Sequence, residues 1–187
     1  MHISFTPEFA GRLQAELGIE DGQERNPHGA KRRYALERAI DQDVLVTTVG
    51  WAASYNGPED TYTDEWGVDW KASCYNTPFG AGRYTEVVGH PLADDSAVTA
   101  YIPPDPTRED LYRSGRALIE EFKDEYFIIG AVATTVFETA WALRGLDKLL
   151  MDFVLNPELA ELILEIPYRY HLHAAKRLTE LGVDMIR

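Results

Sequence analysis

The chain has 187 residues, 45% hydrophobic and 26% charged, which is enough for one folded domain and argues against overall disorder. Lys and Arg number 18 against 31 Asp and Glu, so the net charge of -13 disfavours binding to nucleic acids or anionic membranes. The single cysteine, Cys74, excludes an intrachain disulfide, and a lone reduced thiol explains it more simply than a nucleophile does. The first residues show no secretory-signal pattern, which favours a cytoplasmic protein.

The first 50 residues predict two helices followed by a strand. Thr6-Pro7-Glu8 combines a hydroxyl cap, a first-turn proline and an acidic residue, and Gly18 ends the helix that it starts. A polar loop over Glu20–Gly29 leads to a second predicted helix over Lys31–Ala39. The apolar, β-branched run Val44–Val49 is typical of a buried strand in a parallel sheet.

The next stretch, Trp51–Pro106, is rich in aromatic residues, Gly and Pro and shows little periodicity. Short strands are predicted around Trp66–Trp70 and Tyr84–Val88. Long irregular stretches in compact proteins are usually functional, and the aromatic content argues against disorder. We therefore interpret this stretch as a packed functional loop.

Regular alternation of helices and strands resumes after this stretch. The first predicted element is a helix that opens at Asp105–Asp110 and buries Leu111, Leu118, Ile119 and Phe122. A buried strand over Tyr126–Val132 and a helix over Val136–Leu155 follow. The last two elements are a helix that starts at Asn156-Pro157 and kinks at Pro167, and a strand over Val183–Ile186. We expect the chain to end within this strand, which would leave a sheet edge unpaired.

The alternation predicts an α/β fold with a parallel sheet, either open or closed into a barrel. The chain shows about three or four strand–helix units, whereas a complete TIM (β/α)8 barrel takes roughly 250 residues. We expect residues 1–187 to form the N-terminal portion, about half, of a single barrel domain.

The first group of candidate catalytic residues lies in the acidic, tryptophan-rich run Thr63–Trp70. Burial and mutual repulsion can push the pKa values of the adjacent Asp64 and Glu65 apart, as general acid/base catalysis requires. Trp66 would form a wall of the cleft beside them. The structural alternative is an acidic loop whose tryptophans pack on the fold, and the residues alone favour it.

A second group, Ala133–Glu138, follows the strand predicted over Tyr126–Val132. Ligands of barrels and open sheets bind beyond the carboxyl ends of the strands. Thr134 would offer a hydroxyl there and Glu138 a further substrate contact, while the helix start offers N–H groups to an anion. Simple helix capping is an equally good structural alternative.

The histidines do not form a metal-binding pattern. His171 and His173 are two residues apart on a predicted helix, whereas metal-ligating pairs on helices are usually four apart. His2, His28 and His90 are isolated in the sequence. The sequence therefore predicts no metal site, and it contains neither a phosphate-binding glycine loop nor a Ser-His-Asp pattern.

Six stretches of the chain form a recognisable set. They are Tyr62–Trp70, His90–Asp94, the helix start Pro103–Pro106, Phe137–Gly145, Leu155–Leu159 and Leu181–Arg187. Together they resemble the uroporphyrinogen decarboxylase superfamily, which also contains corrinoid (cobalamin)-dependent methyltransferases. The resemblance covers roughly residues 40–187 and implies a TIM barrel with an active-site cleft at its strand ends, about half of which would be absent from this chain.

The resemblance also implies roles for residues and cofactors. Asp64 resembles the aspartate with which the decarboxylases bind pyrrole N–H groups and stabilise the cation of the protonated ring. In a methyltransferase the same carboxylate would orient or protonate the leaving group. The zinc ligands of the methyltransferase branch, a His-x-Cys pair and a distant Cys, would fall in the absent half, so zinc is expected only in a longer protein. A corrinoid protein would be the partner that carries the methyl group.

One departure from the family pattern decides between its activities. The decarboxylases carry an Arg-Gln-Ala-Gly-Arg-Tyr motif upstream of the cleft aspartate, and its arginines bind the carboxylates of the substrate. Here the nearest string, Ala81–Tyr84, lies downstream of Asp64 and lacks the leading Arg-Gln.

We therefore expect a corrinoid-linked methyltransferase that acts on a small methylated substrate. The alternatives are uroporphyrinogen decarboxylase, a carboxy-lyase of porphyrin and heme biosynthesis, and a non-catalytic fragment or binding module. The expected partners include no nucleic acid and no membrane, and the sequence leaves the oligomeric state open, a homo-oligomer included.

Overall fold

The structure is a computed structural model that describes residue 5 and residues 7–19, 34–50, 61–77 and 80–187. The chain divides into two compact units, each assembled from separate segments. The first unit comprises Met1–Gly50, Arg108–Val132 and Ala175–Arg187, and the second comprises Trp51–Thr107 and Ala133–Ala174. The polar loop predicted over Glu20–Gly29 lies outside the described residues.

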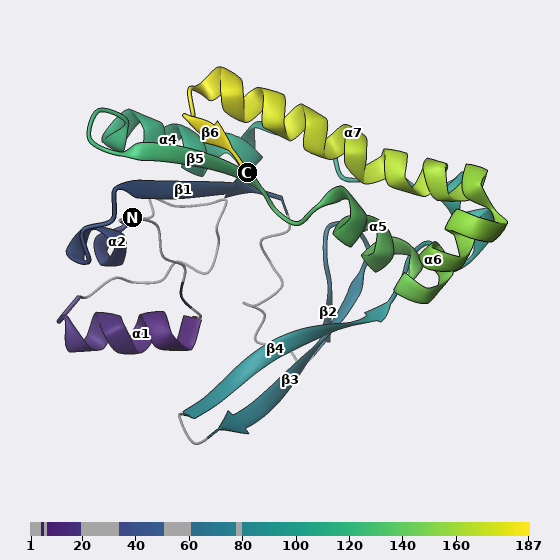
Figure 1. Cartoon of the computed structure of the whole chain (residues 1–187), viewed down its shortest axis with the longest axis horizontal. Helices are drawn as coiled ribbons and strands as arrows, with labels where there is room; N and C mark the ends of the chain where they lie inside the picture. The colour runs from purple at the N-terminus through teal and green to yellow at the C-terminus, as the bar shows by residue number, and fades with distance from the viewer. Residues whose placement is uncertain (1–4, 6, 20–33, 51–60, 78–79) are drawn as a thin grey trace. The chain divides into compact units, whose positions relative to one another are not determined.

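A parallel sheet of three strands forms the first unit (Figure 1). The strands β1 (Val44–Val49), β5 (Phe127–Val132) and β6 (Met185–Ile186) lie in the order β1-β5-β6. The two long strands pair along their whole length, from Val44 beside Phe127 to Val49 beside Val132. The three strands predicted in these regions are thereby confirmed, with small differences at their ends.

Four helical segments of the first unit precede or follow these strands. They are α1 (Pro7–Glu16), α2 (Ala35–Ala39), the 3-10 helix η1 (Glu109–Tyr112) and α4 (Arg113–Phe122). The helices predicted after Thr6-Pro7-Glu8 and after Asp105–Asp110 are confirmed, the latter with a 3-10 first turn. Helix α2 confirms the C-terminal part of the helix predicted over Lys31–Ala39, whose first three residues lie outside the described ones.

The core of the first unit lies between its sheet and its helices. Its buried cluster consists of Tyr34, Leu45, Leu118, Phe122 and Ile128. Each large apolar side chain contributes roughly 1.5–3 kcal/mol when it is fully buried. The inward-facing positions predicted for α4 are therefore confirmed as part of this stabilising core.

An ion pair fixes the short segment before β6. The carboxylate of Asp184 accepts the backbone N–H of Ile128 (2.7 Å) and pairs with Lys123. The hydrogen bond from Ile128, followed by the interaction with Lys123, lowers the pKa of Asp184. The start of β6 is thus held to β5 and to the segment after α4.

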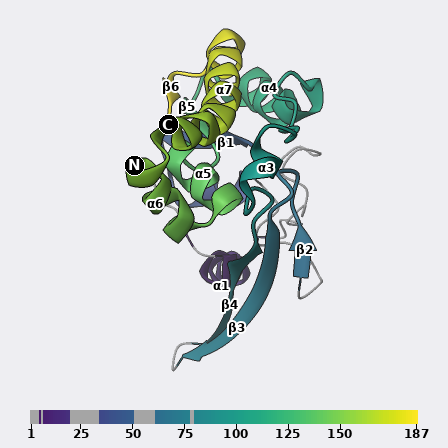
Figure 2. The ribbon, with the colours of Figure 1, turned by 90° about the vertical axis from the view of Figure 1, so that its right-hand side faces the viewer.

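A three-stranded antiparallel sheet belongs to the second unit. It contains β2 (Thr61–Thr63), β3 (Asp69–Thr77) and β4 (Gly80–Gly89), in the order β2-β3-β4. The strands β3 and β4 pair along their full length and form the long ribbon seen in Figures 1 and 2. The strand predicted around Tyr84–Val88 is confirmed as part of β4. The prediction of an irregular loop is wrong for the rest of the β3–β4 ribbon, while residues 51–60 lie outside the described ones.

The outer half of the ribbon explains why the sequence pattern failed. Tyr75 and Tyr84 are both exposed there, so the apolar and polar alternation of a half-buried strand is missing. The strand expected over Trp66–Trp70 begins instead at Asp69, because Gly67 adopts a φ of 74° in the turn before it.

The second unit also contains α3 (Asp95–Val98), α5 (Val136–Arg144), α6 (Leu146–Leu155) and most of α7 (Pro157–Leu181). The single helix predicted over Val136–Leu155 is wrong, because Gly145 separates α5 from α6. Its φ of 94° is accessible to glycine, which has no Cβ, but strained for other residues.

Helix α7 buries one face along most of its length. Its buried positions include Ile163, Tyr170, Ala174 and Leu178. Pro167 lies inside the helix, which continues past it, and a kink at that residue stays a prediction. Among the described residues, no helix is both long and apolar enough to cross a membrane.

Candidate functional site

The acidic loop, Thr63–Trp70, is organised around the carboxylate of Asp64. Its Oδ1 accepts the backbone N–H groups of Trp66 (2.8 Å) and Val68 (3.0 Å), and its Oδ2 accepts the indole N–H of Trp70 (2.7 Å). The backbone N–H of Asp64 also donates to the carbonyl of Val68 (3.0 Å). Asp64 therefore fixes the turn between β2 and β3, a structural function that the spacing of the residues alone did not reveal.

Trp66 packs inside the second unit. It is only 2% exposed, and its ring meets that of Tyr170 of α7 edge to face, with centroids 5.0 Å apart. Tyr101 donates its hydroxyl to the carbonyl of Trp66 (2.7 Å). Burial, and then the negative charges of Asp64 and Glu65, raise the pKa of Tyr101, so its phenol stays a neutral donor. Sequence reasoning missed Tyr101, because nothing in its local pattern indicates a contact so distant along the chain.

The threonine turn, Ala133–Glu138, contains a strained backbone. Thr134 has a φ of 64°, a conformation that is rare for a β-branched residue. Its hydroxyl lies within hydrogen-bonding distance of the carbonyl of Ala133 (2.6 Å) and the hydroxyl of buried Thr139 (2.8 Å). Backbone strain of this kind costs roughly 1–3 kcal/mol and is concentrated at functional sites.

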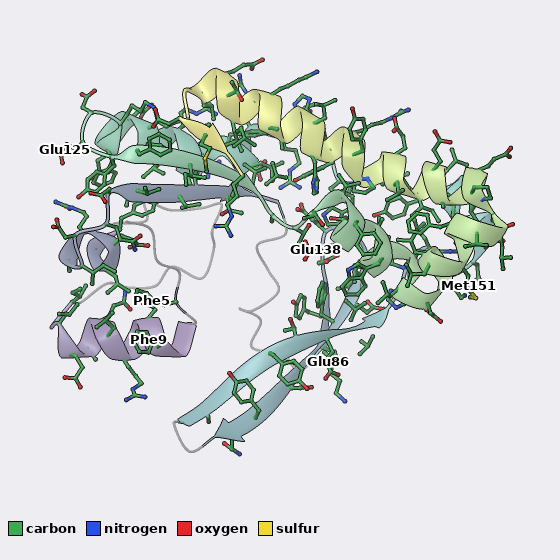
Figure 3. All side chains as sticks on the ribbon, in the orientation of Figure 1. Phe5, Phe9, Glu86, Glu125, Glu138 and Met151 are labelled. Carbon is green, nitrogen blue, oxygen red and sulfur yellow. The ribbon has the colours of Figure 1, made fainter. Side chains whose placement is uncertain are left out.

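Glu138 and Thr135 form a capping box at the N-terminus of α5. The Thr135 N–H donates to Glu138 Oε2 (2.8 Å), and the Glu138 N–H donates to Thr135 Oγ1 (3.1 Å). Figure 3 shows Glu138 at the start of this helix, where its charge meets the positive end of the helix dipole. Helix capping is therefore confirmed for Glu138, while its role as a substrate contact stays a prediction.

The four candidate residues thus form two local groups within the second unit. Asp64 and Trp66 share the acidic loop, in which they are two residues apart and hydrogen-bonded. Thr134 and Glu138 share the threonine turn at the start of α5. That the two groups line one cleft stays a prediction.

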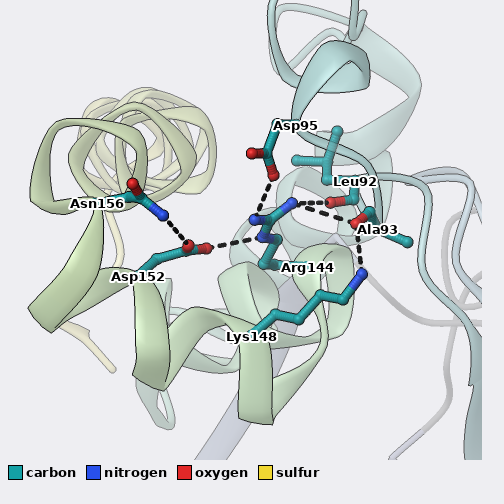
Figure 4. Close-up of polar contacts among 7 residues, drawn as sticks. All are labelled: Leu92, Ala93, Asp95, Arg144, Lys148, Asp152 and Asn156. Atoms are coloured by element: carbon teal, nitrogen blue, oxygen red, sulfur yellow. Dashed lines mark hydrogen bonds and ion pairs between the residues drawn. The ribbon is translucent and has the colours of Figure 1, made fainter.

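A buried arginine at the other end of α5 was not predicted (Figure 4). Arg144 is 4% exposed, and its Nε donates to Asp152 Oδ2 (2.8 Å) and its Nη2 to Asp95 Oδ1 (2.6 Å). Its Nη1 donates to the carbonyls of Leu92 (2.9 Å) and Ala93 (3.3 Å). These five residues, which we call the Arg144 clamp, tie α5 and α6 to the segment after β4.

The Arg144 clamp keeps its charge despite its burial. Burial alone would lower the pKa of Arg144, but hydrogen bonds and charge attraction to Asp152 and Asp95 outweigh this and raise it. Lys148 adds a further bond to the clamp, because its Nζ donates to the carbonyl of Ala93 (2.7 Å). A buried arginine with this many partners is stable. Removing the arginine or one of its carboxylates would leave an unpaired charge and would lower the free energy of unfolding.

The clamp joins two of the stretches on which the family resemblance rests, His90–Asp94 and Phe137–Gly145. The N–H of Leu92 donates to the carbonyl of Leu143 (2.9 Å). Nδ1 of His90 lies 2.7 Å from the carbonyl of Ala142. Since a carbonyl only accepts, this nitrogen carries the proton. The two stretches therefore hold the second unit together.

Metal-ligating side chains do not gather in the part of the chain that the structure describes. No group of three or more His, Cys, Asp or Glu residues there is placed to hold a metal ion. Cys74 is exposed on β3. His171 is partly buried in α7, and this burial lowers its pKa, which favours a neutral ring at pH 7.

The described chain is an α/β protein with a parallel three-stranded sheet and accompanying helices. A methyltransferase from Methanosarcina mazei has a similar structure, with a TM-score of 0.60 and 18% sequence identity. The similarity covers 94% of this chain and 49% of the methyltransferase, so the chain spans about half the length of that protein. At this identity the similarity establishes the fold alone. No family model matches the sequence, and no curated protein matches it either.

Proposed function

We propose that this chain is a methyltransferase of the uroporphyrinogen decarboxylase type, and that its parallel strands form about half of a (β/α)8 barrel. The observation that carries the proposal is the fold similarity to a methyltransferase over 94% of the chain. Coverage of 49% of that protein is what half of a barrel domain would give. The proposed reaction moves a methyl group between a small methylated substrate and a corrinoid carrier protein.

Asp64 would orient the substrate in this reaction. A corrinoid carrier would accept the methyl group, while the substrate heteroatom keeps the electron pair of the broken bond and takes up a proton. Three N–H groups donate to the two carboxylate oxygens of Asp64 and hold the side chain in one orientation. An orienting or electrostatic role therefore fits this geometry better than proton donation.

The other candidate residues would act around this carboxylate. Thr134 is an exposed residue on a strained turn, and we propose it as a substrate contact. Glu138 would act mainly by holding the threonine turn on α5. Trp66 is buried, so its proposed role changes from a wall of the cleft to a support beneath the acidic loop.

Zinc stays an expectation for a longer protein. Among the described residues no three His, Cys, Asp or Glu side chains are placed to hold a metal ion, and Cys74 lies exposed on the β3–β4 ribbon. The steps proposed for this chain are therefore derived without zinc.

A non-catalytic binding module is the second candidate. The observation that favours it is that three of the four candidate side chains have structural roles. Asp64 organises a turn, Trp66 packs on Tyr170, and Glu138 caps a helix. A protein that only binds the small molecule would retain these contacts and transfer no methyl group.

The proposal is tested by incubating the protein with free reduced cobalamin and each of a panel of small N-, O- and S-methyl compounds. The change in cobalamin absorbance reports methyl transfer. With the full-length protein we expect a methylated corrinoid from at least one compound, whereas the 187-residue chain alone would lack half of the proposed barrel and is expected to be inactive or nearly so. Asp64→Asn should lower that rate by at least ~10², because the charge that orients the substrate is lost. The matched control is Asp69→Asn in the same loop, because the carboxylate of Asp69 is exposed and accepts a hydrogen bond from the Thr63 hydroxyl (2.6 Å) rather than organising the turn.

Three results would contradict the proposal. Decarboxylation of uroporphyrinogen without methyl transfer would establish the runner-up activity instead. Binding of a methyl compound without turnover would favour the binding module. An unchanged rate in Asp64→Asn, with the variant folded by circular dichroism, would remove Asp64 from the mechanism.

A further inference from the structure

Tyr101 connects the segment after α3 (Asp95–Val98) to the acidic loop. The side chain is partly buried, and its hydroxyl donates to the carbonyl of Trp66 (2.7 Å), which lies 35 residues away in the sequence. Helix α3 is itself held in place, because Asp95 accepts a hydrogen bond from buried Arg144 (2.6 Å). Tyr101 therefore joins an anchored part of the second unit to the loop that contains Asp64.

The backbone of Trp66 is held on both sides. Its N–H donates to Asp64 Oδ1 (2.8 Å), and its carbonyl accepts the hydroxyl of Tyr101 (2.7 Å). Its ring packs edge to face on Tyr170 of α7, with centroids 5.0 Å apart. The N–H group that binds Asp64 Oδ1 is thereby fixed in position, and it fixes the carboxylate in turn.

The turn in the acidic loop contains a glycine at which the backbone could otherwise rotate. The N–H of Gly67 donates to the carbonyl of Asp64 (3.0 Å), which closes a turn with Glu65 and Trp66 at its centre. Gly67 has a φ of 74°, and glycine adopts other conformations at little steric cost. The carbonyl that Tyr101 binds belongs to the peptide between Trp66 and Gly67. The phenol therefore fixes a peptide whose rotation the glycine would permit.

Burial makes the contact between Tyr101 and Trp66 costly to lose. Trp66 is 2% exposed, so its carbonyl has little access to water. Buried carbonyl groups are almost always hydrogen-bonded, and one that loses its donor destabilises the conformation that buries it. Burial, and then the charges of Asp64 and Glu65, raise the pKa of Tyr101, so the hydroxyl keeps its proton at neutral and mildly alkaline pH.

We propose that Tyr101 is a positioning residue, which holds the carboxylate of Asp64 in its working orientation through the backbone of Trp66. The inference rests on the proposed function, because that function assigns to Asp64 the orientation of a methylated substrate. Tyr101 acts through the loop and does not touch the substrate. A carboxylate that is displaced still attracts the substrate but orients it less well, so the loss falls on kcat more than on KM.

Tyr101→Phe in the full-length protein tests the proposal, because it removes the hydroxyl and keeps the ring. We expect kcat for methyl transfer to fall roughly 10-fold and KM for the methyl compound to change less than about 2-fold. Added to Asp64→Asn, Tyr101→Phe should have almost no further effect, because both changes remove the same function. The matched control is Tyr84→Phe, which removes a hydroxyl that donates to Glu86 (2.7 Å) on the exposed ribbon and should keep the original rate.

Hydrogen exchange followed by mass spectrometry gives a second readout, which needs no activity. Peptides from the acidic loop contain the N–H groups of Trp66 and Val68, which donate to Asp64. Their exchange should accelerate by at least ~10-fold in Tyr101→Phe, while exchange in α5 stays unchanged. Tyr84→Phe should leave exchange in the acidic loop as it is.

The outcomes separate this inference from the proposed function. Unchanged exchange in the acidic loop of Tyr101→Phe overturns the positioning role, whether or not the protein transfers methyl groups. Equal losses of rate from Tyr101→Phe with and without Asp64→Asn also overturn it, since Tyr101 would then act independently of Asp64. Faster loop exchange in a protein that transfers no methyl group overturns the proposed function instead, and leaves Tyr101 as the residue that fixes the loop.

Discussion

The two ends of helix α5 are built in opposite ways. At the C-terminal end, Arg144 is buried and bonded to two carboxylates and two carbonyls. At the N-terminal end, Thr134 is exposed and has a left-handed backbone that a threonine rarely adopts. The C-terminal end therefore stabilises the fold, whereas the N-terminal end retains backbone strain at Thr134 that does not contribute to stability. The difference directs the search for a ligand to the threonine turn.

The largest expected effect comes from the Arg144 clamp. Arg144→Met should lower the free energy of unfolding by about 3–5 kcal/mol, because Asp152 would be left buried and without its partner. Urea denaturation followed by circular dichroism measures the loss. The control is Lys148→Met, which removes a bond to one carbonyl and should cost much less. A loss below that of the control would mean that the clamp does not stabilise the second unit.

The capping box should contribute less. Thr135→Ala removes the acceptor for the Glu138 N–H and should cost about 1 kcal/mol in the same denaturation experiment. Thr135→Ser keeps the hydroxyl and should recover most of the stability. If alanine and serine behave alike, the hydroxyl does not cap α5.

The strained residue should affect ligand binding more than stability. Thr134→Gly removes the strain of the left-handed conformation but adds backbone freedom to the unfolded chain, so stability should change by no more than about 1 kcal/mol. Binding of a methylated substrate, measured by calorimetry, should weaken in the same variant. Full retention of binding would mean that the Thr134 hydroxyl is not a substrate contact.

In the first unit, the carboxylate of Asp184 should make stability depend on pH. The pKa of Asp184 is lowered in the folded chain, mainly by the N–H of Ile128 and then by Lys123. Its contribution to stability is therefore complete above the pKa of the unfolded carboxyl, near 3.9, and is lost as the pH falls through the lower folded value. Asp184→Asn should reduce the unfolding midpoint at pH 7 and have less effect at about pH 3. An equal effect at both values would exclude the ion pair as its cause.

The parallel strands could be predicted from the sequence for a physical reason. Strands buried on both faces are continuous apolar runs, and Val44–Val49 matches its observed strand. Of the β3–β4 ribbon, the sequence predicted a strand only around Tyr84–Val88 and near Trp70, because side chains such as Lys71, Tyr75 and Glu86 are exposed on it. Ladder hydrogen bonds between backbones hold such a ribbon, and they leave little pattern in the side chains.

The candidate site was predictable only in part. The sequence placed Asp64 and Trp66 in one loop but gave no sign that the carboxylate would organise it. The Arg144 clamp was missed because its partners Leu92 and Ala93 lie about 50 residues away, at a separation that no local pattern encodes. The break at Gly145 was missed because an isolated glycine within an apolar helical run predicts only a weaker helix.

Because each unit is assembled from separate segments of the chain, its strands can pair only in a certain order during synthesis. The β3–β4 ribbon closes over a very short connection, so it can form as soon as its residues leave the ribosome. Strand β1 must wait for its partner β5, roughly 80 residues later in the chain, and β5 in turn waits for β6. Until β5 emerges, the nascent polypeptide therefore exposes an unpaired, largely apolar strand, whose edge can pair with other chains.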